Sequence, residues 1–120
     1  MTEDEVKKYI EAYYKNQGYN VTVAYGHTKG IDILAVKNTD TVVIEAKGIG
    51  ARTQARTNYF LSVLGEILQR MESDDFTYYI AFPNHPKYRK LWEALPKVAK
   101  TNTKLGMILV NENGDLEFLY

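Results

Sequence analysis

The sequence of 120 residues contains no cysteine, which excludes disulfides, thiolate zinc sites and cysteine nucleophiles. Only two histidines are present, His27 and His85, so we do not expect a metal site built from several imidazoles. No apolar run approaches the roughly 20 residues that a membrane-spanning helix needs. The first residues are acidic, whereas a secretion signal would be basic and then apolar. These absences predict a cytoplasmic protein without a membrane partner.

The chain also lacks a net charge, because 15 basic residues balance 15 acidic ones. Bulk charge therefore does not indicate a nucleic-acid-binding protein. The distribution is less even, since residues 47–56 hold Lys47, Arg52 and Arg56 and no acid. Such a segment could follow a phosphate backbone, although Arg52 and Arg56, with Gln54, could equally cap and solvate a helix start. Residues 86–104 are also rich in lysine, and a solvated helix face explains them at least as well.

Length and composition are ordinary for a soluble globular protein, with 45% hydrophobic and 25% charged residues. A chain of 120 residues is long enough for one hydrophobic core but not for two. We therefore expect residues 1–120 to form a single domain.

Hydrophobic periodicity predicts an alternation of helices and strands. Thr2 and Glu5 form a capping-box pattern that begins a first helix, and Asn16–Gly18 ends it. We expect strands over residues 19–25, 32–37, 41–47, 76–82, 105–110 and 115–119, a long helix over 54–71, and another helix starting at 83–86. This order predicts an α/β fold in which a mixed β-sheet is flanked by helices.

The long helix over residues 54–71 is expected to bury one side. Glu66 and Gln69 are expected on its exposed side. The predicted buried stripe comprises Phe60, Leu61, Val63, Leu64, Ile67, Leu68 and Met71. The tyrosines, ten in all, could stack on nucleic-acid bases, but most of them fall on apolar stripes and are better assigned to the core.

Charged residues stand in apolar surroundings between residues 30 and 48. Asp32 begins one predicted strand, and Glu45 and Lys47 end the next. Because side chains alternate along a strand, Glu45 and Lys47 point to the same face and Ala46 to the other. A carboxylate and an ammonium at the end of an apolar strand are costly to bury without a purpose.

Two carboxylates and a lysine are a minimal set for holding a hard divalent cation and an activated water. Mg²⁺ prefers oxygen ligands and keeps several waters, and Asp32, Glu45 and a strand carbonyl near Ala46 could supply such ligands. Lys47 would lie beside the bound water and would offset the charge that develops when a phosphate is attacked.

Simpler interpretations exist for each of these residues. Asp32 could be a turn residue at the start of a strand. Glu45 and Lys47 could be a solvated pair on an edge strand, although the apolar run 42–44 favours a buried central strand. His27, in a loop close to Asp32, is expected to be a bystander.

The pattern Asp32-x(12)-Glu45-x-Lys47, behind an acidic N-terminal helix, resembles the PD-(D/E)XK nuclease superfamily. The resemblance implies the restriction-endonuclease-like fold, whose αβββαβ core matches the predicted order through residue 82. It gives Asp32 the place of the first aspartate of the motif, and Glu45 and Lys47 the places of the second acid and the lysine. Ile31 stands where a proline usually precedes the aspartate, which is a common departure.

The same resemblance extends to residues outside the central pattern. Glu5 takes the place of an acid that some members carry on the first helix, although its capping role also explains it. Gln54 is similar to a glutamine that some subgroups carry at the start of the next helix. With Arg52 and Arg56, it is a candidate nucleic-acid contact.

The resemblance implies a Mg²⁺- or Mn²⁺-dependent nuclease that hydrolyses DNA phosphodiester bonds, with Asp32, Glu45, Lys47 and Glu5 as catalytic candidates. The alternative is a protein of the same fold that binds nucleic acid or a protein partner without cutting. A third hypothesis is a homodimer in which the C-terminal strand Glu117–Tyr120 pairs with a second copy.

Overall fold

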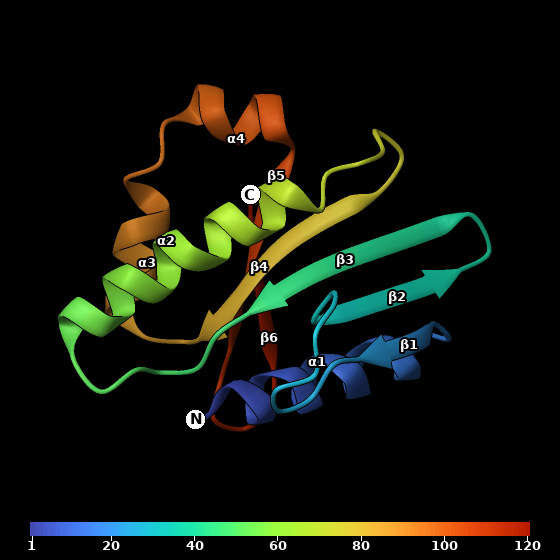
Figure 1. The fold of residues 1–120 in the computed structure, drawn as a ribbon, viewed down its shortest axis with the longest axis horizontal. Coiled ribbons are helices and arrows are strands. Elements are labelled where there is room, and N and C mark those ends of the chain that lie inside the picture. The colour runs from blue at the N-terminus through green and yellow to red at the C-terminus, as the bar shows by residue number, and fades with distance from the viewer.

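Ten helices and strands follow one another in the computed structural model, which describes residues 1–120 (Figure 1). The helices are α1 (Glu3–Asn16), α2 (Thr53–Gln69), α3 (Pro86–Glu93) and α4 (Lys97–Thr103). The strands are β1 (Asn20–Val23), β2 (Ile33–Lys37), β3 (Asp40–Ala46), β4 (Thr77–Pro83), β5 (Leu105–Val110) and β6 (Leu116–Leu119). None of the helices combines the length and the apolar character that crossing a membrane would require.

All the strands belong to one six-stranded sheet, in the order β1-β2-β3-β4-β5-β6. The pairs β1–β2, β2–β3 and β5–β6 are antiparallel, and the central pairs β3–β4 and β4–β5 are parallel. Parallel neighbours need a crossover connection, which α2 supplies between β3 and β4, and α3 with α4 between β4 and β5. The predicted α/β fold with a mixed sheet and flanking helices is therefore confirmed.

Strands β2 and β3 form a hairpin that closes in a turn of two residues, since Lys37 pairs with Asp40. Asn38, the first turn residue, has a φ of 54°, a left-handed conformation that asparagine tolerates better than most residues. This tight turn sets the register that places the two strand ends carrying Asp32 and Glu45 beside each other.

Helices cover both faces of the sheet (Figure 1). Val42, Ile44 and Ala46 of β3 lie in a buried cluster with residues of α1, whereas Val43 lies in a second cluster with residues of α2 and α3. Since side chains alternate along a strand, Glu45 shares the face of Val43 and points toward α2.

The structure corrects two expectations about the helices. Leu61 and Leu68 were expected in the buried stripe of α2, but they are 58% and 47% exposed. The apolar residues of α2 cover more of the helix surface than the side that packs on the sheet, so some of them are exposed to solvent. Helix α4 was not predicted, because it contains no buried residue and so shows no apolar periodicity.

Candidate active site

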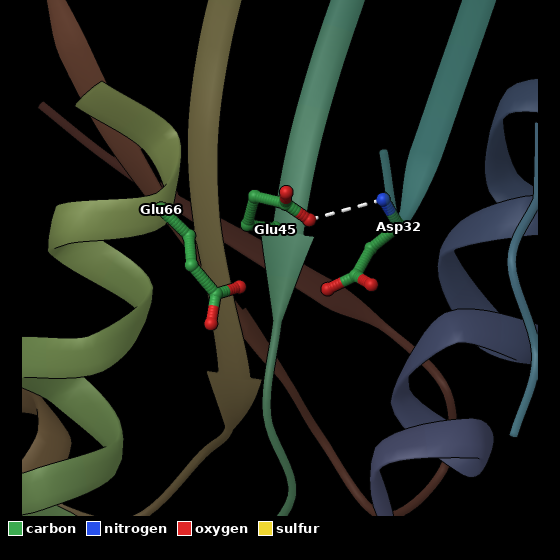
Figure 2. A group of neighbouring side chains, drawn as sticks. All are labelled: Asp32, Glu45 and Glu66. Carbon is green, nitrogen blue, oxygen red and sulfur yellow. Dashed lines mark hydrogen bonds between the residues drawn. The ribbon is translucent and has the colours of Figure 1, made fainter. Parts of the chain in front are cut away.

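Asp32 and Glu45 lie at the same end of the sheet because their strands pair in an antiparallel register. Ile33 of β2 is paired with Ile44 of β3, so Asp32 and Glu45 are the next residues on each side. Figure 2 shows the side chain of Glu45 on β3 beside Asp32, which immediately precedes β2. The prediction that Asp32 and Glu45 lie on adjacent strands thus agrees with the geometry.

Hydrogen bonds run in both directions between these strand ends. The backbone N–H of Asp32 donates to Oε2 of Glu45 at 3.0 Å (Figure 2). The carboxylate of Asp32 accepts from the backbone N–H of Ala46 at 2.9 Å. Each carboxylate is therefore held in a defined orientation by the neighbouring strand, which is a requirement for a preorganised site.

Glu66 of α2 joins Asp32 and Glu45 from across the gap between helix and sheet (Figure 2). Carboxylate oxygens of the three residues all lie within 4.8 Å of one another. Glu66 was expected on the exposed side of α2, and that expectation is wrong, because Glu66 is only partly exposed. Its spacing carried the signal: Glu66 follows the buried Val63 by three residues, which places the two on one side of a helix.

Arg70 provides the positive charge nearest to Glu45. Its Nε donates to Oε1 of Glu45 at 2.9 Å, and Glu45 is 1% exposed. Burial, together with the nearby Asp32 carboxyl, raises the pKa of Glu45 to about 7, although the Arg70 guanidinium acts in the opposite direction. Arg70 thus partly offsets the cost of burying Glu45 as an ionised carboxylate.

A buried lysine on α1 supports Asp32 from the other face of the sheet. Lys7 is 1% exposed, and its Nζ donates to the carbonyl of Ala24 at 2.6 Å. The same Nζ lies 2.8 Å from a carboxylate oxygen of Glu3 and 3.4 Å from Oδ1 of Asp32. Burial lowers the pKa of Lys7, but the Glu3 and Asp32 carboxylates more than offset this, so the net shift is upward.

Lys47 follows β3 directly and forms its ion pair with Glu3 rather than with the three acids. Its Nζ lies 3.4 Å from Oε1 of Glu3 and 5.7 Å from the centre of the Tyr59 ring. These residues border a cavity of about 300 Å³ whose lining also includes Gly48 and Ile49. Glu3 thus connects Lys47 to Lys7, and through Lys7 to Asp32.

Glu5 is engaged at the start of α1 and does not join this cluster. Its carboxylate accepts from the backbone N–H of Thr2 at 3.1 Å, and its own N–H donates to Oγ1 of Thr2 at 3.2 Å. The backbone hydrogen bond from Thr2 lowers the pKa of Glu5. The predicted capping box is confirmed, and Glu3 is the acid of this helix that contacts Lys47.

The three predicted nucleic-acid contacts lie around the start of α2. Arg52 is the exposed N-cap residue, and its side chain makes no capping hydrogen bond. Gln54 is exposed and donates to Oδ1 of Asn58 at 3.4 Å. Arg56 is partly buried and donates through Nε to the carbonyl of Ile49 at 3.0 Å. Arg52 and Gln54 are thus exposed to solvent, whereas Arg56 holds the loop that follows Lys47 through its hydrogen bond to Ile49.

Comparison with known proteins gives a family model that matches part of the chain and solved structures that share its fold. A family model described as restriction endonuclease (Mrr_cat) matches residues 1–58, a span that includes Asp32, Glu45 and Lys47. A search of the curated proteins found no match.

Two crystal structures share the fold of this chain. An XisH family protein from Nostoc punctiforme aligns with a TM-score of 0.63 and 16% identity, covering 96% of this chain and 98% of the other. A fdxN element excision controlling factor protein from Anabaena variabilis aligns with a TM-score of 0.65 and 18% identity, covering 98% and 99%. At such identities the likeness shows the fold alone. The family match and the observed sheet confirm that this chain resembles the PD-(D/E)XK nuclease superfamily and has its restriction-endonuclease-like fold.

Proposed function

We propose that this protein is a divalent-metal-dependent nuclease that hydrolyses phosphodiester bonds in DNA. The observation that carries the proposal is the convergence of Asp32, Glu45 and Glu66, whose oxygens lie within 4.8 Å of one another. They meet at the strand ends that carry the family pattern, in a chain whose first 58 residues match a restriction endonuclease model.

The donor set fits a hard cation such as Mg²⁺ or Mn²⁺. Carboxylate oxygens are the ligands that these ions prefer, and a bound cation would favour the ionised form of Glu45, whose pKa is raised by burial. Asp32, Glu45 and Glu66 would hold the ion, and the carbonyl of Ala46 remains a predicted fourth ligand. When bound, the ion would polarise the phosphoryl group and acidify a water molecule.

Neighbouring residues hold the acids in position, and others would contact the phosphate and the DNA backbone. The Ala46 N–H and the Lys7 ammonium hold the carboxylate of Asp32 from two directions, and Arg70 holds that of Glu45. Lys47 lies at the border of an adjoining cavity, where its ammonium would offset the negative charge of the attacked phosphate. Arg52 and Gln54, exposed at the start of α2, would contact the DNA backbone.

One observation favours a second candidate, a protein of nuclease fold that binds DNA without cutting it. The ammonium of Lys47 is paired with Glu3, so the lysine of the motif is not aimed at the three acids. In this candidate the ion pairs of Lys47 and Arg70 serve stability, and DNA binding requires no metal. Pairing of the C-terminal edge strand β6 with a second copy remains a further prediction.

A cleavage assay separates the two candidates. Single-stranded, duplex and branched DNA are incubated with Mg²⁺, Mn²⁺ or EDTA, using wild-type protein, Asp32→Ala and Lys47→Met. Glu112→Gln, at an exposed position in the turn before β6, is the control. Metal-dependent cleavage that Asp32→Ala abolishes and Glu112→Gln retains supports the nuclease. Identical behaviour of wild type and Asp32→Ala on every substrate would refute it.

A further inference from the structure

A second cavity lies on the α1 face of the sheet, at the end opposite to the three acids. Asp40 and Thr77, the first residues of β3 and β4, border it, whereas Glu45 and Ala46 end β3. Its volume is about 260 Å³. Six aromatic side chains line it: Tyr13, Tyr14, Tyr19, Tyr79, Phe118 and Tyr120.

The rings form walls at steep angles to one another rather than a flat stack. Tyr14 meets Tyr13 at 86° and Tyr19 at 83°, with 5.0 Å between ring centres in both pairs. On the sheet side, Tyr79 meets Phe118 at 67° and Tyr120 at 60°. Steeply inclined rings can present π-electron faces to one enclosed group from several directions, as aromatic cages do.

One hydroxyl at this cavity has no hydrogen-bond partner within the chain. Tyr14 as a residue is 5% exposed, but its hydroxyl oxygen remains accessible, because no fully buried side-chain oxygen lacks a partner. The neighbouring hydroxyls differ, because Tyr19 donates to the Asp40 carboxylate and the hydroxyls of Tyr79 and Tyr120 pair at 2.8 Å. The Tyr14 hydroxyl is therefore available to a polar group that enters the cavity.

The charges around the cavity favour a cation. Asp40 contributes a carboxylate, Gln17 lies at the C-terminal end of α1, and no lysine or arginine belongs to the lining. The C-terminal end of a helix carries partial negative charge. Just outside the cavity, the Lys37 ammonium already contacts the helix end and one of the rings. Its Nζ donates to the carbonyl of Gln17 at 2.7 Å and lies 5.7 Å from the centre of the Tyr19 ring.

We propose that the aromatic cavity binds a small methylated ammonium cation of the choline type. The rings attract a diffuse and weakly hydrated charge, Asp40 balances that charge, and the Tyr14 hydroxyl pairs with a polar substituent such as the hydroxyl of choline. The volume falls just below the range of about 300–1,000 Å³ found for drug-sized ligands, which suits so small a molecule. The proposal does not depend on nuclease activity.

The test compares choline with 3,3-dimethylbutan-1-ol, a neutral molecule of nearly the same shape. Each is titrated into the full chain, with EDTA and without DNA, and tyrosine signals are followed by NMR. We expect choline to bind at least about tenfold more tightly than the neutral molecule, which corresponds to ~1.4 kcal/mol. Equal affinity for the two, or saturation by neither at millimolar concentration, overturns the proposal.

Two variants test whether Asp40 and Tyr14 contribute to choline binding. Asp40→Asn should weaken choline binding about tenfold, and Tyr14→Phe should weaken it less, because only one hydroxyl is lost. Asp75→Asn, at an exposed site before β4, should leave it unchanged. A thermal melt of each variant excludes unfolding as the cause. Unchanged affinity in a folded Asp40→Asn variant contradicts the proposal.

A second titration tests whether the cavity binds a free methylated amine or one carried by a protein. It compares a peptide that contains trimethyl-lysine with the unmethylated form of the same peptide. Binding of choline alone supports a free methylated amine, and preferential binding of the methylated peptide supports a protein-borne one. Binding of adenosine in place of either compound would identify a base-stacking pocket and overturn the proposal.

Discussion

Lys7 and Asp32 form an ion pair between α1 and the start of β2, with 3.4 Å between Nζ and Oδ1. Lys7 is buried, and two carboxylates and the carbonyl of Ala24 surround its ammonium. The first aspartate of the motif is therefore oriented by a helix that precedes it by some twenty residues in the chain.

Replacing this lysine should weaken the fold. We expect Lys7→Met to lower the free energy of unfolding by about 3 kcal/mol, because it leaves Asp32 and Glu3 without their buried partner. Lys8→Met, at the exposed neighbouring position, should change it by less than about 0.5 kcal/mol. Urea denaturation of both variants measures the difference, and a Lys7→Met variant as stable as Lys8→Met would show that the buried pair contributes no stability.

Glu66 should matter for divalent cations although it lies outside the sequence pattern. We expect Glu66→Gln to reduce the affinity for Mn²⁺ at least about tenfold, because it removes one of three converging carboxylates. Glu72→Gln removes a charge at an exposed position shortly after the same helix and should have little effect. Calorimetric titration with Mn²⁺ compares the two, and equal affinities would exclude Glu66 as a ligand.

Stability without metal should fall as the pH rises through neutrality. The pKa of Glu45 is raised to about 7 in the folded protein, above the usual value of about 4.3 for an unfolded chain. Between these pH values the folded state binds more protons than the unfolded state, so the free energy of unfolding decreases with pH. We expect a decrease on the order of 1–3 kcal/mol from pH 5 to pH 8.

Urea denaturation in EDTA across that range measures this dependence. Glu45→Gln should flatten it, since the side chain no longer titrates. Excess Mg²⁺ should also flatten it or reverse its sign, because a bound cation favours the ionised acid. A wild-type profile without any fall between pH 5 and pH 8 would contradict the raised pKa.

Glu5 should behave as a helix cap. We expect Glu5→Ala to lower the free energy of unfolding slightly, because the hydrogen bond to the Thr2 N–H is lost. Its affinity for Mn²⁺ should match that of wild type. Denaturation and calorimetry on the same preparation test both statements. A large loss of Mn²⁺ affinity in Glu5→Ala would show that Glu5 contributes to the metal site.

Two glycines should respond in opposite ways to alanine. A Cβ on Gly48 would lie 2.7 Å from the backbone N of Glu3 and 3.0 Å from the carbonyl carbon of Thr2, so Gly48→Ala must push the start of α1 away from β3. Gly65 lies within α2 and has open space around the same position. Gly65→Ala should therefore stabilise the protein by about 0.5–1 kcal/mol, whereas Gly48→Ala should destabilise it. Thermal melts of the two variants provide the comparison.

Local patterns were sufficient to predict the sheet and two of the three acids in the cluster. The apolar run 42–44 indicated a buried central strand, and the spacing of Asp32 and Glu45 placed both acids at one end of a strand pair. Glu66 and Lys7 were missed because each is a charged residue inside an amphipathic helix, where a solvated position is the ordinary expectation. Their burial depends on partners distant in the sequence, which single-element periodicity does not report.

The acidic cluster draws its members from three separate segments, with Glu66 on α2 and Asp32 and Glu45 on the sheet. Without a cation, mutual repulsion of these carboxylates acts directly across the contact between α2 and the sheet. Local opening in the cation-free protein should therefore begin with separation of α2, and its amide hydrogens should exchange faster than those of β3 and β4. A cation held by all three acids would join helix and sheet as a crosslink does, and the exchange of α2 would report its arrival.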